Sequence, residues 1–184
     1  ARLHEHGFKY RDMAILFRSV RSSCGPLLEA LENREIPANC GGRTGLFLQL
    51  EARLLGRSYA WLVDNEWRDA RFGGDSEEVA LSSLLSEYET LFGNSDPIPG
   101  LKAFLQDWKR NTSDTRRSVD LVGEYYRLLR LLGVHQWNLD NPYHINRSGM
   151  LARFSNLLAD YENATRRSRS LRIAIRNLAD YIQR

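Results

Sequence analysis

Cysteine and lysine are scarce in this chain of 184 residues, and long apolar runs are missing altogether. The two cysteines, Cys24 and Cys40, have no histidine at the spacing of a zinc site. We therefore expect two reduced thiols, with no disulfide framework and no metal centre. No apolar run approaches the roughly 18 residues of a membrane-spanning helix, and nothing resembles a signal peptide. These absences predict a cytoplasmic protein without a membrane partner.

The residues that are abundant indicate a folded, arginine-rich protein. Apolar residues make up 42% of the chain and charged residues 27%, which is enough to bury a substantial core. Only Lys9, Lys102 and Lys109 are lysines among 26 basic residues, and a GC-rich genome is the first explanation for that bias. Residues 111–184 are the basic part of the chain, and residues 46–110 are the acidic part.

The first 45 residues predict a strand, a helix and a second short strand. Met13 to Phe17 is an apolar run bounded by charges, too short for a helix and typical of a strand buried on both faces of a parallel sheet. Pro26 suits the first turn of a helix, and Pro37 ends that helix. We expect Ala38 to Cys40 to be extended, and the pair Gly41-Gly42 to interrupt the secondary structure before the next helix.

Beyond residue 45 the sequence predicts one helix after another. Apolar residues recur at helical spacing throughout, and Ser76, Gly93 and Gly133 are expected to cap helix ends. We expect the loop 137–146 to separate the last two helices from the others. The fold class is therefore mostly α, with segment 1–45 distinct from a helical domain over 46–184. The predicted helices cover 46–63, 76–92, 101–108, 115–132, 150–161 and 171–182.

The stretch from Tyr10 to Phe47 resembles the UvrD/Rep/PcrA-type superfamily 1A DNA helicases, at the point where their second RecA-like motor domain (2A) passes into the helical 2B insertion. The segment Met150 to Glu162 also resembles a helix near the end of 2B in some members. The residues that match the family pattern are Asp12, Ala14, Ile15, Leu16, Arg18, Ser19, Glu29, Ala30, Leu31, Ile36, Pro37, Gly41, Gly42, Phe47 and Glu51.

The resemblance implies a fragment of an ATP-dependent 3′-to-5′ DNA helicase. Segment 1–45 would be a partial RecA-like 2A strand-helix-strand piece, and 46–184 a bundle-like 2B accessory domain. The parent protein would bind ATP and Mg²⁺, and its partners would be single-stranded DNA, possible duplex DNA and the rest of the motor. This chain lacks the Gly-rich loop ending in Lys-Ser/Thr that binds phosphates. The segment 41–45 has neither the lysine nor the spacing of such a loop, and we expect it only to interrupt the regular secondary structure. We therefore expect no catalytic, cofactor-binding or metal-binding residue here, and no activity from the fragment alone.

Two groups of residues are the predicted DNA contacts. Arg18 and Ser19 follow the first strand, at the carboxyl edge of a sheet where ligands collect. The resemblance implies that Arg18 contacts single-stranded DNA, and a guanidinium there could fork onto a phosphate. The competing interpretation pairs Arg18 with Asp12 or Glu29. Val20 replaces an asparagine that is common in the family, and Arg21 could compensate electrostatically.

The second group lies near the end of the chain, where no acid occurs between Glu162 and Asp180. Such a cluster is a plausible footprint for a nucleic-acid backbone, and a solvated helix face is the alternative. The predicted DNA-binding residues of this group are Arg166, Arg167, Arg169 and Arg172, and Arg176 belongs to the same run.

Other candidates favour structural roles. The tryptophans could stack on bases, but three of the four occupy apolar helical positions and suit a core. His135, His144 and Asp140 lack a nucleophile motif, so packing or capping is the better interpretation. The chief alternative to a helicase fragment is a non-catalytic helical module that binds protein or nucleic acid. The oligomeric state is not predicted.

Overall fold

The computed structural model describes residues 2–16, 26–27, 30–31, 34, 36, 46–47, 49–68, 76–114, 119–165 and 170–183. The chain divides into two compact units, Ala1–Leu48 and Gln49–Arg184. Over the described residues both units contain helices and irregular segments, and no strand of a sheet. The prediction of a mostly helical protein is therefore confirmed.

The first unit begins with a short helix and a 3₁₀ turn. Helix α1 spans Arg2–Glu5, and the 3₁₀ helix η1 spans Tyr10–Asp12. The His4 ring stacks on Tyr10 with 4.1 Å between ring centroids, and its Nδ1 lies 2.9 Å from the carbonyl oxygen of Phe8. His4 therefore helps to close this turn, and within the described residues no group of metal-ligating side chains is found.

The described residues do not support the strand predicted over Met13 to Phe17. Residues 13–16 form no ladder with any described segment, and the side chains of Ile15 and Leu16 are 59% and 92% exposed. The physical reason is that a strand of a parallel sheet needs neighbours on both edges and layers on both faces. Of the predicted helix, residues 26–27 and 30–31 are helical, and the predicted second strand lies outside the described residues.

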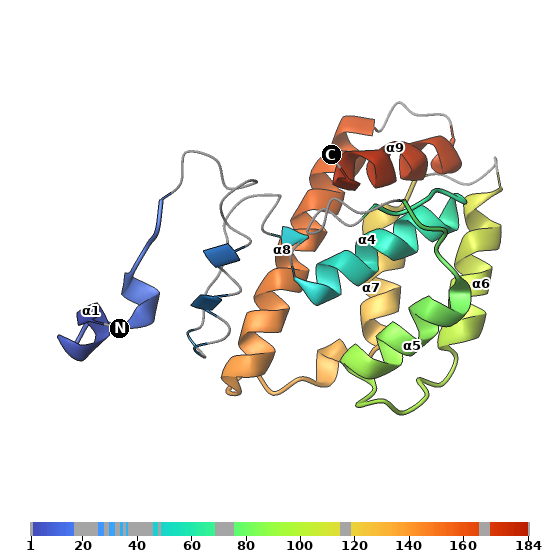
Figure 1. Cartoon of the computed structure of the whole chain (residues 1–184). Helices are drawn as coiled ribbons and strands as arrows, with labels where there is room; N and C mark the ends of the chain where they lie inside the picture. The colour runs from blue at the N-terminus through green and yellow to red at the C-terminus, as the bar shows by residue number, and fades with distance from the viewer. Residues whose placement is uncertain are drawn as a thin grey trace. The chain divides into compact units, whose positions relative to one another are not determined.

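The second unit is a helical bundle built around one central helix (Figure 1). Helix α4, Leu50–Leu62, packs against α5, α6, α8 and α9, and α7 packs against α6 and α8. Most side chains of α4 are buried, which is typical of a helix enclosed by others. The remaining elements are α5 (Leu81–Phe92), α6 (Leu101–Thr112), α7 (Leu121–Leu131), η2 (Val134–Gln136), α8 (Pro142–Thr165) and α9 (Leu171–Gln183).

Aromatic side chains fill the centre of this bundle. Tyr59 of α4 is fully buried, with its ring edge-on to Trp108 at 5.3 Å and stacked on Phe154 at 6.0 Å. The Tyr125 hydroxyl donates to the carbonyl oxygen of Leu151 at 2.9 Å, which joins α7 to α8. The prediction that most tryptophans serve the core is confirmed, since Trp61, Trp67 and Trp108 are all buried.

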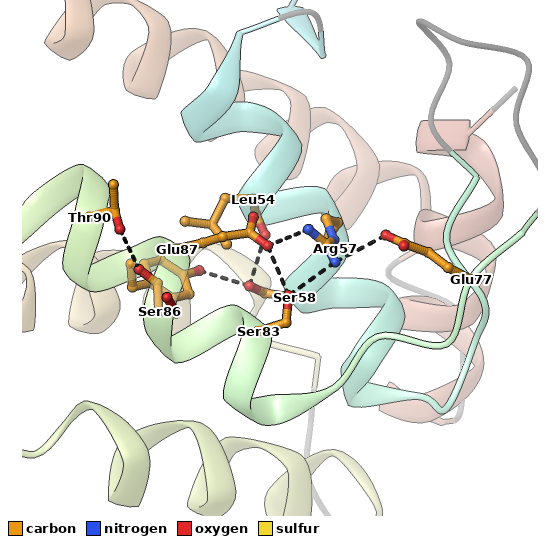
Figure 2. Close-up of polar contacts among 9 residues, drawn as sticks. Leu54, Arg57, Ser58, Glu77, Ser83, Ser86, Glu87 and Thr90 are labelled. Carbon is orange, nitrogen blue, oxygen red and sulfur yellow. Dashed lines mark hydrogen bonds and ion pairs between the residues drawn. The ribbon is translucent and has the colours of Figure 1, made fainter. Parts of the chain in front are cut away.

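A polar seam joins α4 to α5 (Figure 2). The Arg57 guanidinium forms ion pairs with Glu87 of α5 and, at 3.0 Å, with Glu77 of the segment before it. Ser58 Oγ donates to the Leu54 carbonyl oxygen at 2.9 Å and lies 2.8 Å from the Tyr88 hydroxyl. Because the single Ser58 proton is already used, the Tyr88 hydroxyl is the donor in that second bond.

Four helix starts differ from the sequence-based expectation. Helix α4 begins at Leu50 instead of 46, and α7 begins at Leu121 instead of 115. The other two differences have a local explanation. Ser76 is not an N-cap, because the backbone of Glu77 pairs with Trp67 through two hydrogen bonds of 2.8 Å, and α5 begins only at Leu81. The loop predicted over 137–146 is helical from Pro142 onward, and Asn141 Oδ1 accepts a hydrogen bond from the Tyr143 backbone at 2.9 Å. An asparagine cap before a proline is a start signal that the sequence carried.

The predicted glycine cap at Gly93 is confirmed, whereas the C-cap of α7 is Leu132, one residue before the predicted Gly133. Gly93 is the C-cap of α5, and Gly133, with φ of 72°, follows α7 in the left-handed conformation that glycine adopts at little cost. The N-terminus of α7 is capped twice. Asp120 accepts from the Gly123 backbone at 2.9 Å, and Glu162 of α8 accepts from the backbones of Leu121 and Val122.

Candidate nucleic-acid interface

Of the residues predicted to contact DNA, the structure describes Arg172. This arginine lies in the first turn of α9, directly after the buried Leu171, and its side chain is 36% exposed. The prediction of DNA contact by Arg18, Ser19, Arg21, Arg166, Arg167 and Arg169 falls on residues outside the described part of the chain.

Arg172 is held in place by two polar side chains from other parts of the second unit. Its Nη2 lies 2.9 Å from Oδ2 of Asp64, just after α4, and its Nη1 donates to Ser113 Oγ at 3.1 Å, just after α6. The guanidinium therefore spans the ends of two helices. Sequence reasoning treated Arg172 as one member of a run, and the structure adds these two partners.

Lys109 of α6 approaches the same carboxylate from the other side. Its Nζ lies 2.6 Å from Asp64 Oδ1 and 4.4 Å from the centroid of the Trp61 ring. Hydrogen bonds from Lys109 and Arg172 lower the pKa of the Asp64 carboxyl below its usual range. We name Asp64, Lys109, Ser113 and Arg172 the Asp64 cluster.

A shallow depression lies beside this cluster. Its floor includes the Trp61 ring beneath Lys109, and its rim carries further hydrogen-bond donors. Arg110 on the rim is exposed and forms an ion pair with Asp107, three residues earlier on the same helix. Each of the two cations that line the depression, Lys109 and Arg110, is therefore paired with one acid. The lining residues are Trp61, Leu81, Gln106, Lys109, Arg110 and Ser113.

The Asp64 cluster was missed by sequence reasoning for a clear reason. Asp64 and Arg172 are 108 residues apart, and Lys109 has one adjacent basic residue, Arg110, in the last turn of α6. Because the chain has few lysines, the presence of a lysine at position 109 was the one feature of the sequence that set this residue apart from the many arginines.

A second cluster, at the start of α8, is structural. Arg147 is only 10% exposed, pairs with Glu51 at 2.5 Å and donates to the Leu91 carbonyl oxygen at 2.8 Å. Its guanidinium lies 4.7 Å from the Trp137 ring centroid and is near two other rings. These contacts tie α8 to α4 and α5.

The histidines near this cluster make structural contacts too. His144 stacks on Trp137 at 5.3 Å, and its Nδ1 lies 3.1 Å from the Asn138 carbonyl oxygen. His135 is exposed in the middle of the 3₁₀ turn η2. Over the described residues no group of three or more metal-ligating side chains is present. These contacts agree with the packing role expected for His144.

Comparison of the chain with protein-family models, with curated proteins and with solved structures found no match in any of the three. The family resemblance over Tyr10 to Phe47 therefore stays a hypothesis from sequence. Within the described residues, no helix is long and apolar enough to cross a membrane.

Proposed function

We propose that this chain is part of an ATP-dependent, superfamily 1A, 3′-to-5′ DNA helicase. Residues 1–45 would belong to the 2A motor domain, and residues 46–184 would form a 2B-like accessory domain. The observation that carries the proposal is the residue pattern from Tyr10 to Phe47, followed directly by a helical unit. In the parent protein, the segment Met13 to Phe17 would pair with the other strands of the 2A sheet.

The role of this part would be DNA contact and regulation rather than hydrolysis. ATP and Mg²⁺ would bind to motor residues outside the chain, and closure of the motor would step the enzyme along one strand. Arg166, Arg167 and Arg169 lie within six residues of Arg172 in the sequence, and this basic segment supports contact with a nucleic-acid backbone. Arg18, Ser19 and Arg21 would contact the tracking strand on the motor side.

The test uses the protein that the complete reading frame encodes. With ATP and Mg²⁺ it should unwind a duplex that carries a 3′ single-stranded tail, and the matched 5′-tailed duplex should remain paired. The chain of residues 1–184 alone should hydrolyse no ATP. Magnesium-dependent turnover by this chain above background would refute the proposal, as would a parent protein without a Gly-x-x-x-x-Gly-Lys-Thr loop.

A non-catalytic helical interaction module is the second candidate. It is favoured by the second unit, since Gln49–Arg184 forms a compact body with a buried aromatic core of its own. Such a body does not need a motor domain to bury its apolar surface. A reading frame without helicase motifs on either side, together with DNA or protein binding by the chain alone, would decide for the module.

A further inference from the structure

We propose that the Asp64 cluster and the adjoining depression bind a phosphate group, supplied by a nucleic-acid backbone, and that Asp64 occupies the phosphate position in the unbound protein. This inference rests on the proposed function, because it places one DNA contact of the accessory domain at named side chains. The cluster consists of Asp64, Lys109, Ser113 and Arg172.

The hydrogen-bonding pattern around Asp64 is the first argument. Each carboxylate oxygen has its own cation, with Lys109 Nζ 2.6 Å from Oδ1 and Arg172 Nη2 2.9 Å from Oδ2. Ser113 Oγ lies next to the second cation, 3.1 Å from Arg172 Nη1. A phosphate group also presents separate anionic oxygens to separate donors, and arginine and lysine are its usual ligands. The carboxylate thus stands where a phosphate would be recognised.

Exposure identifies the carboxylate as the movable partner. The Asp64 side chain is 58% exposed, whereas those of Lys109 and Arg172 are 30% and 36% exposed. Asp64 follows α4 with φ of 56°, a left-handed conformation that aspartate tolerates better than most residues. The cations are better enclosed, and Lys109 also rests on the Trp61 ring. A ligand can therefore displace the acid into solvent and leave the donors in place.

The local charge balance favours an anion once Asp64 has moved. Lys109, which lines the depression, and Arg172, which contacts the lining residue Ser113, are then left without a carboxylate between them. Gln106, another lining residue, adds neutral donor capacity. Arg110 shares its charge with Asp107. Arg176 is exposed one turn beyond Arg172 on α9, and this spacing extends the basic surface along one helix face. The surface therefore suits a ligand with several phosphates more than a single small anion.

The experiment measures binding of the 184-residue chain to a fluorescently labelled single-stranded oligonucleotide and to its duplex, over rising salt concentration. Asp64→Asn should tighten binding by about two- to fivefold, as expected for removal of an exposed competing ion pair. Lys109→Gln and Arg172→Gln should each weaken binding and lower the slope of log K against log salt by about one. Lys109→Arg keeps the charge and should retain binding.

The matched control is Arg127→Gln, which removes one exposed basic residue that pairs with Glu124 on α7. It should leave both the affinity and the salt slope unchanged. A second arm adds inorganic phosphate, which should compete with the oligonucleotide far more weakly per phosphate than unlabelled DNA does. Circular dichroism and thermal unfolding of each variant confirm that it is folded.

Three results would overturn the inference. The first is equal weakening by the Lys109, Arg172 and Arg127 substitutions, which would indicate a diffuse surface charge. The second is unchanged or weaker binding by the folded Asp64→Asn variant. The third is binding of inorganic phosphate at the cluster that the oligonucleotide does not displace.

Failure of this inference can be distinguished from failure of the proposed function. If the parent protein unwinds the 3′-tailed duplex but any of these three results is obtained, the helicase proposal is supported and the inference of a phosphate site is refuted. If the substitutions change binding as expected but the parent protein does not unwind the duplex, the inference of a phosphate site is supported and the helicase proposal is refuted.

Discussion

Replacement of Tyr59 by phenylalanine should stabilise this protein, although the residue lies at the centre of the core. The Tyr59 hydroxyl is completely buried and has no hydrogen-bond partner among the described residues. Burial raises the pKa of Tyr59 well above its usual value, so the group stays a neutral hydroxyl. A buried hydroxyl without a partner has lost its hydrogen bonds to water and has gained none in exchange.

The magnitude follows from what the substitution removes and what it keeps. An unsatisfied buried polar group costs about 1–3 kcal/mol, and Tyr59→Phe removes that cost. The ring contacts with Trp108 at 5.3 Å and Phe154 at 6.0 Å do not involve the oxygen and are kept. The dispersion contacts of one oxygen atom are lost and offset part of the gain. We expect a net stabilisation of about 1 kcal/mol, or about 2–4 °C in Tm.

Two other buried tyrosines supply matched controls. The hydroxyls of Tyr88 and Tyr125 each have a partner, at 2.8 Å and 2.9 Å, so the same substitution there should cost about 0.5–1.5 kcal/mol. Urea unfolding followed by circular dichroism gives the three midpoints under one set of conditions. If Tyr59→Phe lowers the midpoint as much as Tyr88→Phe does, the reasoning from hydroxyl pairing is wrong.

Three further predictions test other parts of the second unit. Gly56→Ala should destabilise the protein by about 1–3 kcal/mol, because the added Cβ would lie 2.7 Å from the Trp67 ring. Gly149 has open space around it, so Gly149→Ala should stabilise the protein by up to about 1 kcal/mol in the same urea assay. Arg147→Ala should cost about 3 kcal/mol, since it leaves a largely buried glutamate without its cation, and an effect below that of an ordinary surface substitution would contradict the structure. The pKa of Asp64 is lower in the folded state than in the unfolded state. Its ion pairs therefore stabilise the fold above about pH 4, and this stabilisation is lost as the pH falls through the folded-state pKa. The free energies of unfolding of Asp64→Asn and of the natural chain should differ at neutral pH and converge in acid.

The helices of the second unit could be predicted largely from local sequence. Gly93 and Gly133 marked two helix ends, since each follows an apolar periodic segment. Of the two, Gly133 has the left-handed φ that glycine adopts readily after a helix. The start at Ser76 failed because the backbone of Glu77 pairs with Trp67, a contact between segments that no local pattern encodes. Tertiary pairing overrode a local cap signal there.

The candidate site was predictable only in part. Arg172 was identified from a run of arginines, but its partners Asp64 and Ser113 come from helix ends that are distant in sequence. The same limit applies to Glu162, which caps α7 from 41 residues away. Charge runs are visible in a sequence, whereas single charges that converge from separate helices become visible only after the helices pack.

The packing of the bundle also explains why three separate charges converge so closely. Each charged member of the Asp64 cluster directly follows a buried residue, since Val63, Trp108 and Leu171 all lie in the core. The core therefore fixes the backbone at all three positions, and contacts with Ser113 and the Trp61 ring also hold the Arg172 and Lys109 head groups. Convergence of like charges on one carboxylate is then a consequence of how α4, α6 and α9 pack, and a phosphate that replaced the carboxylate would meet donors already in position.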